Sequence, residues 1–197
     1  MTLPMKGTRL PHMCTQSGKF LDLMKFSEED VVIDDIAHGL ACVNRFGGQA
    51  KVPISVAQHS IYVSQLCQGT PFTLQALLHD ASEAYIGDMI FMLKRSPEMN
   101  QYRKLEEHIQ HTIYRKFGCE VEEPPELVAA DKLMVEFEAK HGFTPGCFRF
   151  DMPGYAFPSP EEEQKVGEWN PWSWKDSKQA FLRHFTKCCV TLGIDHI

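Results

Sequence analysis

The adjacent residues His79 and Asp80, in the stretch LLHDASEAYIGD, have side chains suited to metal chemistry. Neighbouring residues on an α-helix point about 100° apart, so both can reach one ion only at a helix bend or end, or when the ion lies between their directions. His59 lies among apolar residues on an earlier predicted helix, and Asp131 borders an apolar stripe on a later one. Two imidazole nitrogens and two carboxylate oxygens suit Mn, Fe, Co, Ni or Zn, with positions left for water and substrate.

Each of these residues has an ordinary explanation when it is taken alone. A single buried histidine is more often a core residue than a ligand, and a single helix carboxylate is more often solvated. A buried carboxylate without a partner is costly, and the usual remedy is a cation or a hydrogen-bond network. Glu83 and Asp88 follow the His-Asp pair within one or two turns. Because all these residues occur together on successive predicted helices, we favour one shared metal site.

Hydrolysis of a phosphate ester would use further residues near this set. A bound divalent ion lowers the pKa of its water toward about 7, and a carboxylate within hydrogen-bond reach takes up the proton. Glu83 is four residues after His79, on the same side of a helix. Arg45 offers a planar fork for phosphate oxygens and Lys94 a mobile point charge, although a plain surface charge is the alternative for both.

The apolar spacing predicts the helices that would position these residues. Ser55, Ser96-Pro97 and the Ser173–Asp176 pair read as helix starts, and Asp34 or Asp35 could cap the first helix. A short strand pair is predicted around Phe20–Met24 and Val31–Ile33. The predicted helices cover about 35–43, 56–67, 73–86, 97–117, 125–142 and 174–192, while residues 143–172 are expected to be irregular.

These elements predict an all-α fold, in which residues 20–197 form a single domain of five to seven helices with an irregular C-terminal segment. Residues 1–19 are expected to be a loosely structured lead. The net charge of −6 argues against a partner that is a nucleic-acid polymer. The sequence shows neither a signal peptide nor a run of about 20 apolar residues, so we expect no membrane contact. Seven cysteines without a CxxC pair favour reduced thiols in a cytoplasm.

The order of His59, His79-Asp80 and Asp131 resembles the HD-domain metal-dependent phosphohydrolases. It most resembles the branch that holds bacterial 5′-deoxynucleotidases and phage dATP triphosphohydrolases (DatZ). The resemblance runs from about residue 17 to about residue 140, and the C-terminal third carries little of it. The stretches that carry it are DIAHGLACVNRFGGQAKVPISVAQHSIYVSQL and QALLHDASEAYIGDM, followed by the helix with Asp131.

The resemblance implies a role for each matching residue. It implies one divalent transition metal (Co, Mn, Zn, Fe or Ni), with additional Mg or Mn accompanying the phosphates. Glu83 and Asp88 would orient and deprotonate the attacking water. Arg45 and Lys94 would contact phosphate, and Phe46 would stack on or near the base, where relatives often carry tryptophan. The implied metal ligands are His59, His79, Asp80 and Asp131.

The resemblance also implies a cytoplasmic enzyme, from a bacterium or a phage-infected cell, that trims the deoxynucleotide pool as a homodimer or larger assembly. We narrowly favour a dATP-type dNTP triphosphohydrolase that releases deoxynucleoside and triphosphate. The alternative is a 5′-deoxynucleotidase that converts dNMP to deoxynucleoside and phosphate. Hydrolysis of (p)ppGpp ranks lower, because enzymes of that class usually follow the His-Asp pair with Glu-Asp, and here Glu83 is followed by Ala84. Hydrolysis of cyclic dinucleotides also ranks lower, because it requires a Gly-Tyr-Pro signature, to which the only near match is Gly154-Tyr155-Ala156. A non-catalytic nucleotide-sensing HD module is a remote alternative, since every ligand position is filled.

Overall fold

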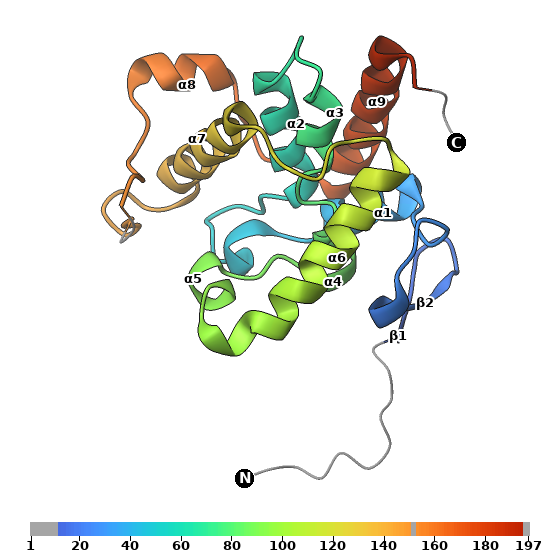
Figure 1. Ribbon diagram of the computed structural model, residues 1–197. Coiled ribbons are helices and arrows are strands. Elements are labelled where there is room, and N and C mark those ends of the chain that lie inside the picture. The colour runs from blue at the N-terminus through green and yellow to red at the C-terminus, as the bar shows by residue number, and fades with distance from the viewer. Residues whose placement is uncertain (1–11, 151–152, 195–197) are drawn as a thin grey trace, which may run out of the picture.

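The computed structural model describes residues 12–150 and 153–194, and it is mostly helical (Figure 1). The predicted all-α class is confirmed. The helices are α1 (Ile33–Cys42), α2 (Val56–Leu66), α3 (Thr73–Leu78), α4 (Glu83–Ile86), α5 (Phe91–Lys94), α6 (Asn100–Lys116), α7 (Pro125–Gly142), α8 (Pro160–Val166) and α9 (Trp174–Leu192), with short 3-10 turns at Leu23–Lys25, Arg45–Gly48 and Pro97–Met99. None of the described helices is long and apolar enough to cross a membrane.

Two apolar clusters hold the helices together. The larger one lies between α1, α2, α3 and α9, with α6 packed against its side, and includes Ile36, Leu77 and Phe181. The smaller one joins α2 to α7 and α8 through Val63 and Met134. Helix α2 therefore lies between both clusters, and its residues from Val56 to Ser64 are all buried. A polar side chain on this helix has to find its partner inside the protein.

The helix starts predicted at Ser55 and Ser173 agree with the structure, and the one predicted at Asp34 or Asp35 differs. Ser96-Pro97 opens the 3-10 turn Pro97–Met99, and α6 follows only at Asn100. Ser55 accepts a hydrogen bond from the amide of Gln58, and Ser173 accepts one from that of Asp176, as N-cap residues do. By contrast, α1 begins at Ile33 after Val32, so the prediction of Asp34 or Asp35 as its cap was wrong. The Asp35 carboxylate instead accepts hydrogen bonds from the amide and hydroxyl of Ser17.

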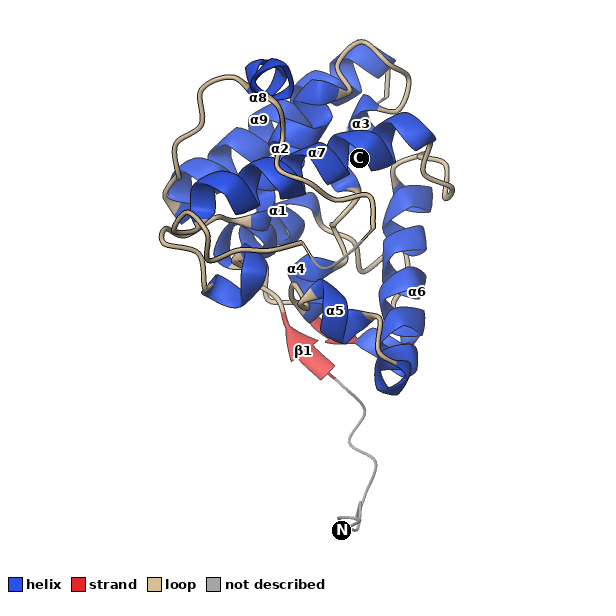
Figure 2. Cartoon of the chain, turned by 90° about the vertical axis from the view of Figure 1, so that its left-hand side faces the viewer, coloured by secondary structure: helices blue, strands red, loops and turns tan. Residues whose placement is uncertain are grey.

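The strand pair differs from the prediction in its partner. Strand β2 (Phe20–Asp22) pairs antiparallel with β1 (His12–Cys14), while residues 31–33 lead into α1. A turn at Gly18, with a positive φ of 88°, brings the two strands together. Residues 12–19 of the expected loose lead are thus structured, and residues 1–11 lie outside the described residues. The pair lies at the opposite end of the molecule from α8 (Figure 2).

The predicted helix over 73–86 is interrupted, which corrects the sequence-based boundary. Helix α3 ends at Leu78, residues 79–82 form turns, and α4 starts at Glu83. The side chain of Gln110, on α6, replaces the missing helical hydrogen bonds: its Nε2 donates to the Leu78 carbonyl at 2.7 Å and its Oε1 accepts from the Ser82 amide at 2.9 Å. The helix can therefore break here without leaving these buried backbone groups unpaired.

Helix α4 packs very closely against α1. A Cβ atom added at Gly39 would lie 2.7 Å from the Cβ and the carbonyl oxygen of Ala84, which is too close for any side chain. The contact fixes the distance between α1 and α4, the short helix that begins with Glu83. In the expected irregular segment, 143–172, the structure also contains α8, which opens with a capping box formed by Ser159 and Glu162.

Candidate metal site and adjoining pocket

Three side chains from separate helices converge on one point. His59 lies in the middle of α2, His79 caps the end of α3, and Asp131 lies on α7. Each offers a ligand atom within 4.8 Å of the other two, a group that could hold a metal ion. The Nε2 atoms of His59 and His79 lie 3.0 and 3.6 Å from Asp131 Oδ1. The break after Leu78 provides the helix end that the adjacent His79 and Asp80 require.

The other nitrogen of each imidazole indicates what the convergent atoms need. His79 Nδ1 lies 2.9 Å from the carbonyl oxygen of Ala76, which can only accept, so Nδ1 carries the proton. His59 Nδ1 likewise faces the Glu138 carboxylate at 3.1 Å. In the neutral imidazoles both Nε2 lone pairs therefore point toward carboxylate oxygens, and His79 Nε2 has no hydrogen-bond partner although Asp80 Oδ2 lies 3.2 Å away. Such a cluster requires two extra protons or one cation, so these donors fit a metal ion.

Asp80 borders this group rather than belonging to it in the present geometry. Its Oδ2 lies 3.2 Å from His79 Nε2 and 3.8 Å from His59 Nε2, and it also accepts a hydrogen bond of 3.3 Å from Arg45. The fourth expected ligand is therefore beside the others, and its role as a ligand stays a prediction.

Glu138 is a site residue that the sequence interpretation missed. It is completely buried on α7 and accepts a 2.8 Å hydrogen bond from Arg45 Nε. Its other oxygen accepts a hydrogen bond from His59 Nδ1 at 3.1 Å. Carboxylates that bind the outer nitrogen of a metal-ligating histidine fix its ring and its tautomer. The available signal was its position seven residues after Asp131, two helical turns along the same face.

The charges in this cluster depend on one another. Burial would lower the pKa of His79, but the Asp80 and Asp131 carboxylates raise it well above its usual value. Burial would raise the pKa of Asp131, but the adjacent His59 and His79 imidazoles, which carry positive charge when protonated, hold it well below its usual range. Against the cost of burial, His59 and Arg45 likewise lower the pKa of Glu138. The carboxylates are thus held ionised, which suits cation binding.

The expected water-activating residues lie beside the cluster. Glu83 is 3% exposed, and its Oε2 has no hydrogen-bond partner. Burial, with added repulsion from Asp80 and Asp88, raises the pKa of Glu83 well above its usual value. Burial also raises the pKa of Asp88. Lys94 lies 3.7 Å from Glu83 and 2.7 Å from Glu106, whose carboxylate raises the Lys94 pKa although burial opposes this.

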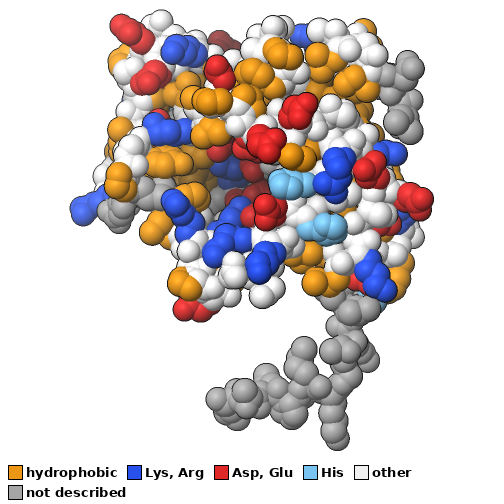
Figure 3. Space-filling model, in the orientation of Figure 1, with side chains coloured by type: hydrophobic (Ala, Val, Ile, Leu, Met, Phe, Trp, Pro, Cys, Tyr) orange, Lys and Arg blue, Asp and Glu red, His pale blue; other side chains and the backbone are white. Residues whose placement is uncertain are grey.

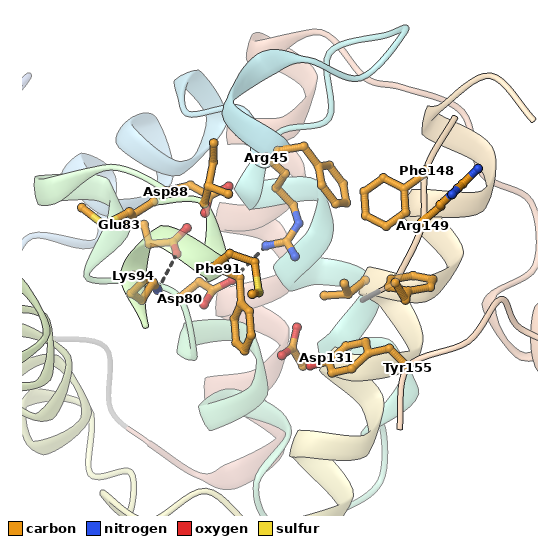
Figure 4. A pocket seen from close by; sticks show the side chains of 16 residues that line it. Arg45, Asp80, Glu83, Asp88, Phe91, Lys94, Asp131, Phe148, Arg149 and Tyr155 are labelled. Carbon is orange, nitrogen blue, oxygen red and sulfur yellow. Dashed lines mark hydrogen bonds and ion pairs between the residues drawn. The ribbon is translucent and has the colours of Figure 1, made fainter. Parts of the chain in front are cut away.

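A pocket of about 380 Å³ opens beside these groups. On the face seen in Figure 3, the surface is hollowed where acidic and basic side chains gather. Of the nine predicted site residues, seven line the pocket, while His59 and His79 are buried behind it. Figure 4 shows Asp80, Glu83, Asp88 and Lys94 on one side, with the Phe91 ring beside them, and Phe148, Arg149 and Tyr155 on the other. The predicted residues that line it are Arg45, Phe46, Asp80, Glu83, Asp88, Lys94 and Asp131.

Phe46 lies in the Arg45–Gly48 turn in a left-handed conformation, with φ 55°. This conformation is uncommon for a residue other than glycine, and strained residues of this kind cluster at active sites and ligand clamps. The ring contacts Phe143 and Phe148 edge to face, at centroid distances of 5.2 and 5.9 Å. The expected aromatic residue therefore faces the pocket as part of a larger group of rings.

Comparison with known proteins gives relatives and no activity. No family model matches the sequence. The chain is 36% identical over 136 residues to an uncharacterized protein of Rhodobacter capsulatus, covering 63% of this chain and 69% of that protein. It is 37% identical over 135 residues to the uncharacterized protein YfdR of Escherichia coli (strain K12), covering 68% of this chain and 74% of YfdR. The chain belongs to the family of YfdR.

Proposed function

We propose that this protein is a metal-dependent phosphohydrolase of the HD-domain type that acts on a deoxynucleotide. The observation that carries the proposal is the convergence of His59, His79 and Asp131, from three helices, beside a pocket. Ionisable groups whose pKa values are strongly perturbed by burial and by specific charged partners, next to a cleft, mark a candidate functional site. The resemblance of the sequence to HD-domain enzymes supplies the substrate class.

The residues divide the work of hydrolysis among them. His59, His79 and Asp131, with Asp80 as the fourth ligand, would hold one divalent transition metal, which when bound supplies a Lewis acid and acidifies a water molecule. Glu83 suits the uptake of the proton, because it is buried, has an unpaired oxygen and has a raised pKa. Asp88, which also lines the pocket, would orient the water.

The phosphate group is assigned to the side of the pocket that carries Arg45 and Lys94. Each cation is held by a carboxylate behind it: Glu138 for Arg45 and Glu106 for Lys94. These ion pairs fix the two side chains, so that little entropy is lost when they bind a phosphate. The water would attack phosphorus as Glu83 takes its proton, the ester P–O bond would break, and the deoxynucleoside would leave as its alcohol with the proton returned from Glu83.

Of the two substrates left open by the sequence, the pocket favours the monophosphate, contrary to our narrow preference. Four carboxylates line it against three cations, Arg45, Lys94 and Arg149. Glu138 and Glu106 already neutralise two of these cations, so even with a divalent ion the balance stays slightly negative. A phosphate monoester, with about two negative charges, meets less repulsion there than a triphosphate. A triphosphate would bring more negative charge than these groups offset. The dATP-type triphosphohydrolase stays the second candidate, on the strength of the resemblance alone.

The test uses protein stripped of metal with a chelator and reloaded with Mn, Co, Zn or Mg. We expect metal-dependent release of phosphate and deoxyadenosine from dAMP, resolved by ion-exchange chromatography. Release of triphosphate from dATP, without cleavage of dAMP, would favour the second candidate. His141→Ala is the control for replacement of His79: His141 is exposed on the same helix as Asp131, so its loss should leave metal-dependent activity unchanged. Failure of every metal with dNMPs, dNTPs and rNTPs would refute the proposal. Assembly into dimers or larger forms, and a cytoplasmic location, stay predictions from the resemblance.

A further inference from the structure

The side of the pocket opposite the carboxylates is built from rings of the C-terminal third. Phe148, Phe150 and Tyr155 line the pocket there (Figure 4 labels Phe148 and Tyr155). Phe150 contacts Phe148 at a centroid distance of 5.0 Å and stacks on Tyr155 at 5.7 Å. Phe148 continues the row to Phe46. We call Phe46, Phe148, Phe150 and Tyr155 the aromatic wall. Three of its four members lie outside the segment that resembles HD-domain enzymes.

The chemistry of the lining is divided between its two sides. The carboxylates, Asp131 among them, and the cations Arg45 and Lys94 lie at the metal end. Among the described residues that line the pocket there is no Ser, Thr, Asn, Gln or His, and Tyr155 contributes the one neutral hydroxyl. The aromatic wall therefore offers ring faces and edges. Apart from the Tyr155 hydroxyl and the Arg149 guanidinium beside Phe148, the described lining residues on this side have no side-chain group that could read the hydrogen-bonding edge of a base.

We propose that the aromatic wall is a stacking site for the flat ring of the substrate, and that it selects for the presence and size of the ring rather than for its identity. The inference rests on the proposed function for the position of the phosphate. Stacking of a base on aromatic side chains tolerates every base, because each has a π-face. Purines, with the larger ring, are bound better than pyrimidines.

The size of the effect follows from known stacking strengths. Loss of one aromatic contact with a base typically weakens binding about 10- to 100-fold. A site that reads hydrogen bonds can reject a wrong substrate about 10,000-fold, because its own buried polar groups are left unpaired. The near absence of neutral polar groups here predicts a spread of about tenfold among the four bases, with a large advantage over a substrate that has no ring.

The test compares kcat/KM for dAMP, dGMP, dCMP, dTMP and deoxyribose 5-phosphate, which has the same ester and no ring. We expect the nucleotides to exceed deoxyribose 5-phosphate at least about tenfold. Phe148→Leu and Phe150→Leu keep an apolar side chain of similar size but remove the flat ring. Both should lower kcat/KM for the nucleotides about tenfold and leave deoxyribose 5-phosphate unchanged. Phe157→Leu is the control, because Phe157 contacts Phe150 but does not line the pocket.

The outcomes separate this inference from the proposed function. Equal losses on deoxyribose 5-phosphate and on nucleotides, no loss at all, or a preference for one base above about 1000-fold would overturn the stacking site while hydrolysis stands. If the wild type cleaves none of these substrates, the assignment of a monophosphate substrate fails. Calorimetry with dAMP and deoxyribose 5-phosphate then decides the stacking site by itself: tighter binding of dAMP supports it, and equal or absent binding overturns it. Thermal unfolding of each variant checks that it folds.

Discussion

The two sides of the pocket are built in different ways. At the metal end, the two histidines and Asp131 come from α2, the end of α3 and α7. Both ring nitrogens of His59 lie within hydrogen-bond distance of a carboxylate, and His79 faces the Ala76 carbonyl with Nδ1 and the Asp80 carboxylate with Nε2. The aromatic wall comes from the Arg45–Gly48 turn and from the segment between α7 and α8, where rings contact mostly other rings. Hydrogen bonds between helices orient the side chains at the metal end, whereas the rings of the wall lie on less regular segments and are held by packing on one another, and sites on helices are positioned more precisely than sites on loops. The difference suggests that the helices carry the reaction and the loop carries the choice of substrate.

His79→Ala offers the strongest way to break this comparison. Removal of an imidazole from the convergent group should release the metal and lower turnover at least about 1000-fold on every substrate, because the site loses both its cation and its Lewis acid. Metal content by mass spectrometry and phosphate release are the two measurements. Asp80→Ala should likewise abolish activity. Unchanged turnover in both variants would refute the metal site.

Glu83→Ala should separate binding of the metal from use of the water. We expect the variant to keep its metal and to lose turnover about 100-fold or more, since a water-activating carboxylate is removed while the ligands remain. Metal content and kcat for dAMP are measured together. If the metal is lost instead, Glu83 acts as a ligand and its role was misassigned.

Glu138→Gln tests the support behind the metal site. His59 and Arg45 bind different oxygens of Glu138, and an amide replaces one of these acceptors with a donor NH2 group, so one of the two hydrogen bonds is lost. We therefore expect metal affinity to fall about 10- to 100-fold. Competition with a chromogenic chelator gives the dissociation constant. Glu136→Gln is the matched control, because Glu136 is a buried carboxylate on the same helix that contacts Lys132 and Ala156. Equal affinity in both variants would contradict the assigned role.

Gln110→Leu should have the smallest effect on turnover. It leaves the Ser82 amide without its partner and removes one of the two hydrogen bonds to the Leu78 carbonyl, which also accepts from the Ala81 amide. This should cost about 1–3 kcal/mol of stability and lower kcat several-fold by loosening the turn that holds His79. Gln75→Leu removes a similar bridge, to the carbonyls of Glu120 and Glu122, away from the predicted site residues. Urea unfolding and kcat should show that both variants lose stability and that only Gln110→Leu loses turnover.

The sequence predicted most of the helices because their apolar residues repeat at helical spacing, and Ser55 and Ser173 mark starts with local signals. It also named the residues that the structure brings together, from His59 to Asp131. The break at residues 79–82 was not predictable, because its stabilising residue, Gln110, lies 28 residues away from Ser82. Contacts at long sequence distance leave no periodic trace.

The same reason explains the other differences. Glu138 looked like any helix carboxylate until its partners His59 and Arg45, 79 and 93 residues away, were in place. The partner of β2 depended on a turn at Gly18 that apolar spacing does not reveal. The rings of the aromatic wall come largely from an irregular segment without periodicity, so their common direction appears only in three dimensions.

Gly39 lies outside the pocket, at the close contact between α1 and α4. The hydrogen atom at its Cα occupies space that no methyl group could share with Ala84. A survey of all single substitutions should therefore find a sharply intolerant position one helix removed from any ligand or substrate contact. Redesign of this protein for another substrate has freedom along the loop that follows α7, and little where two backbones touch.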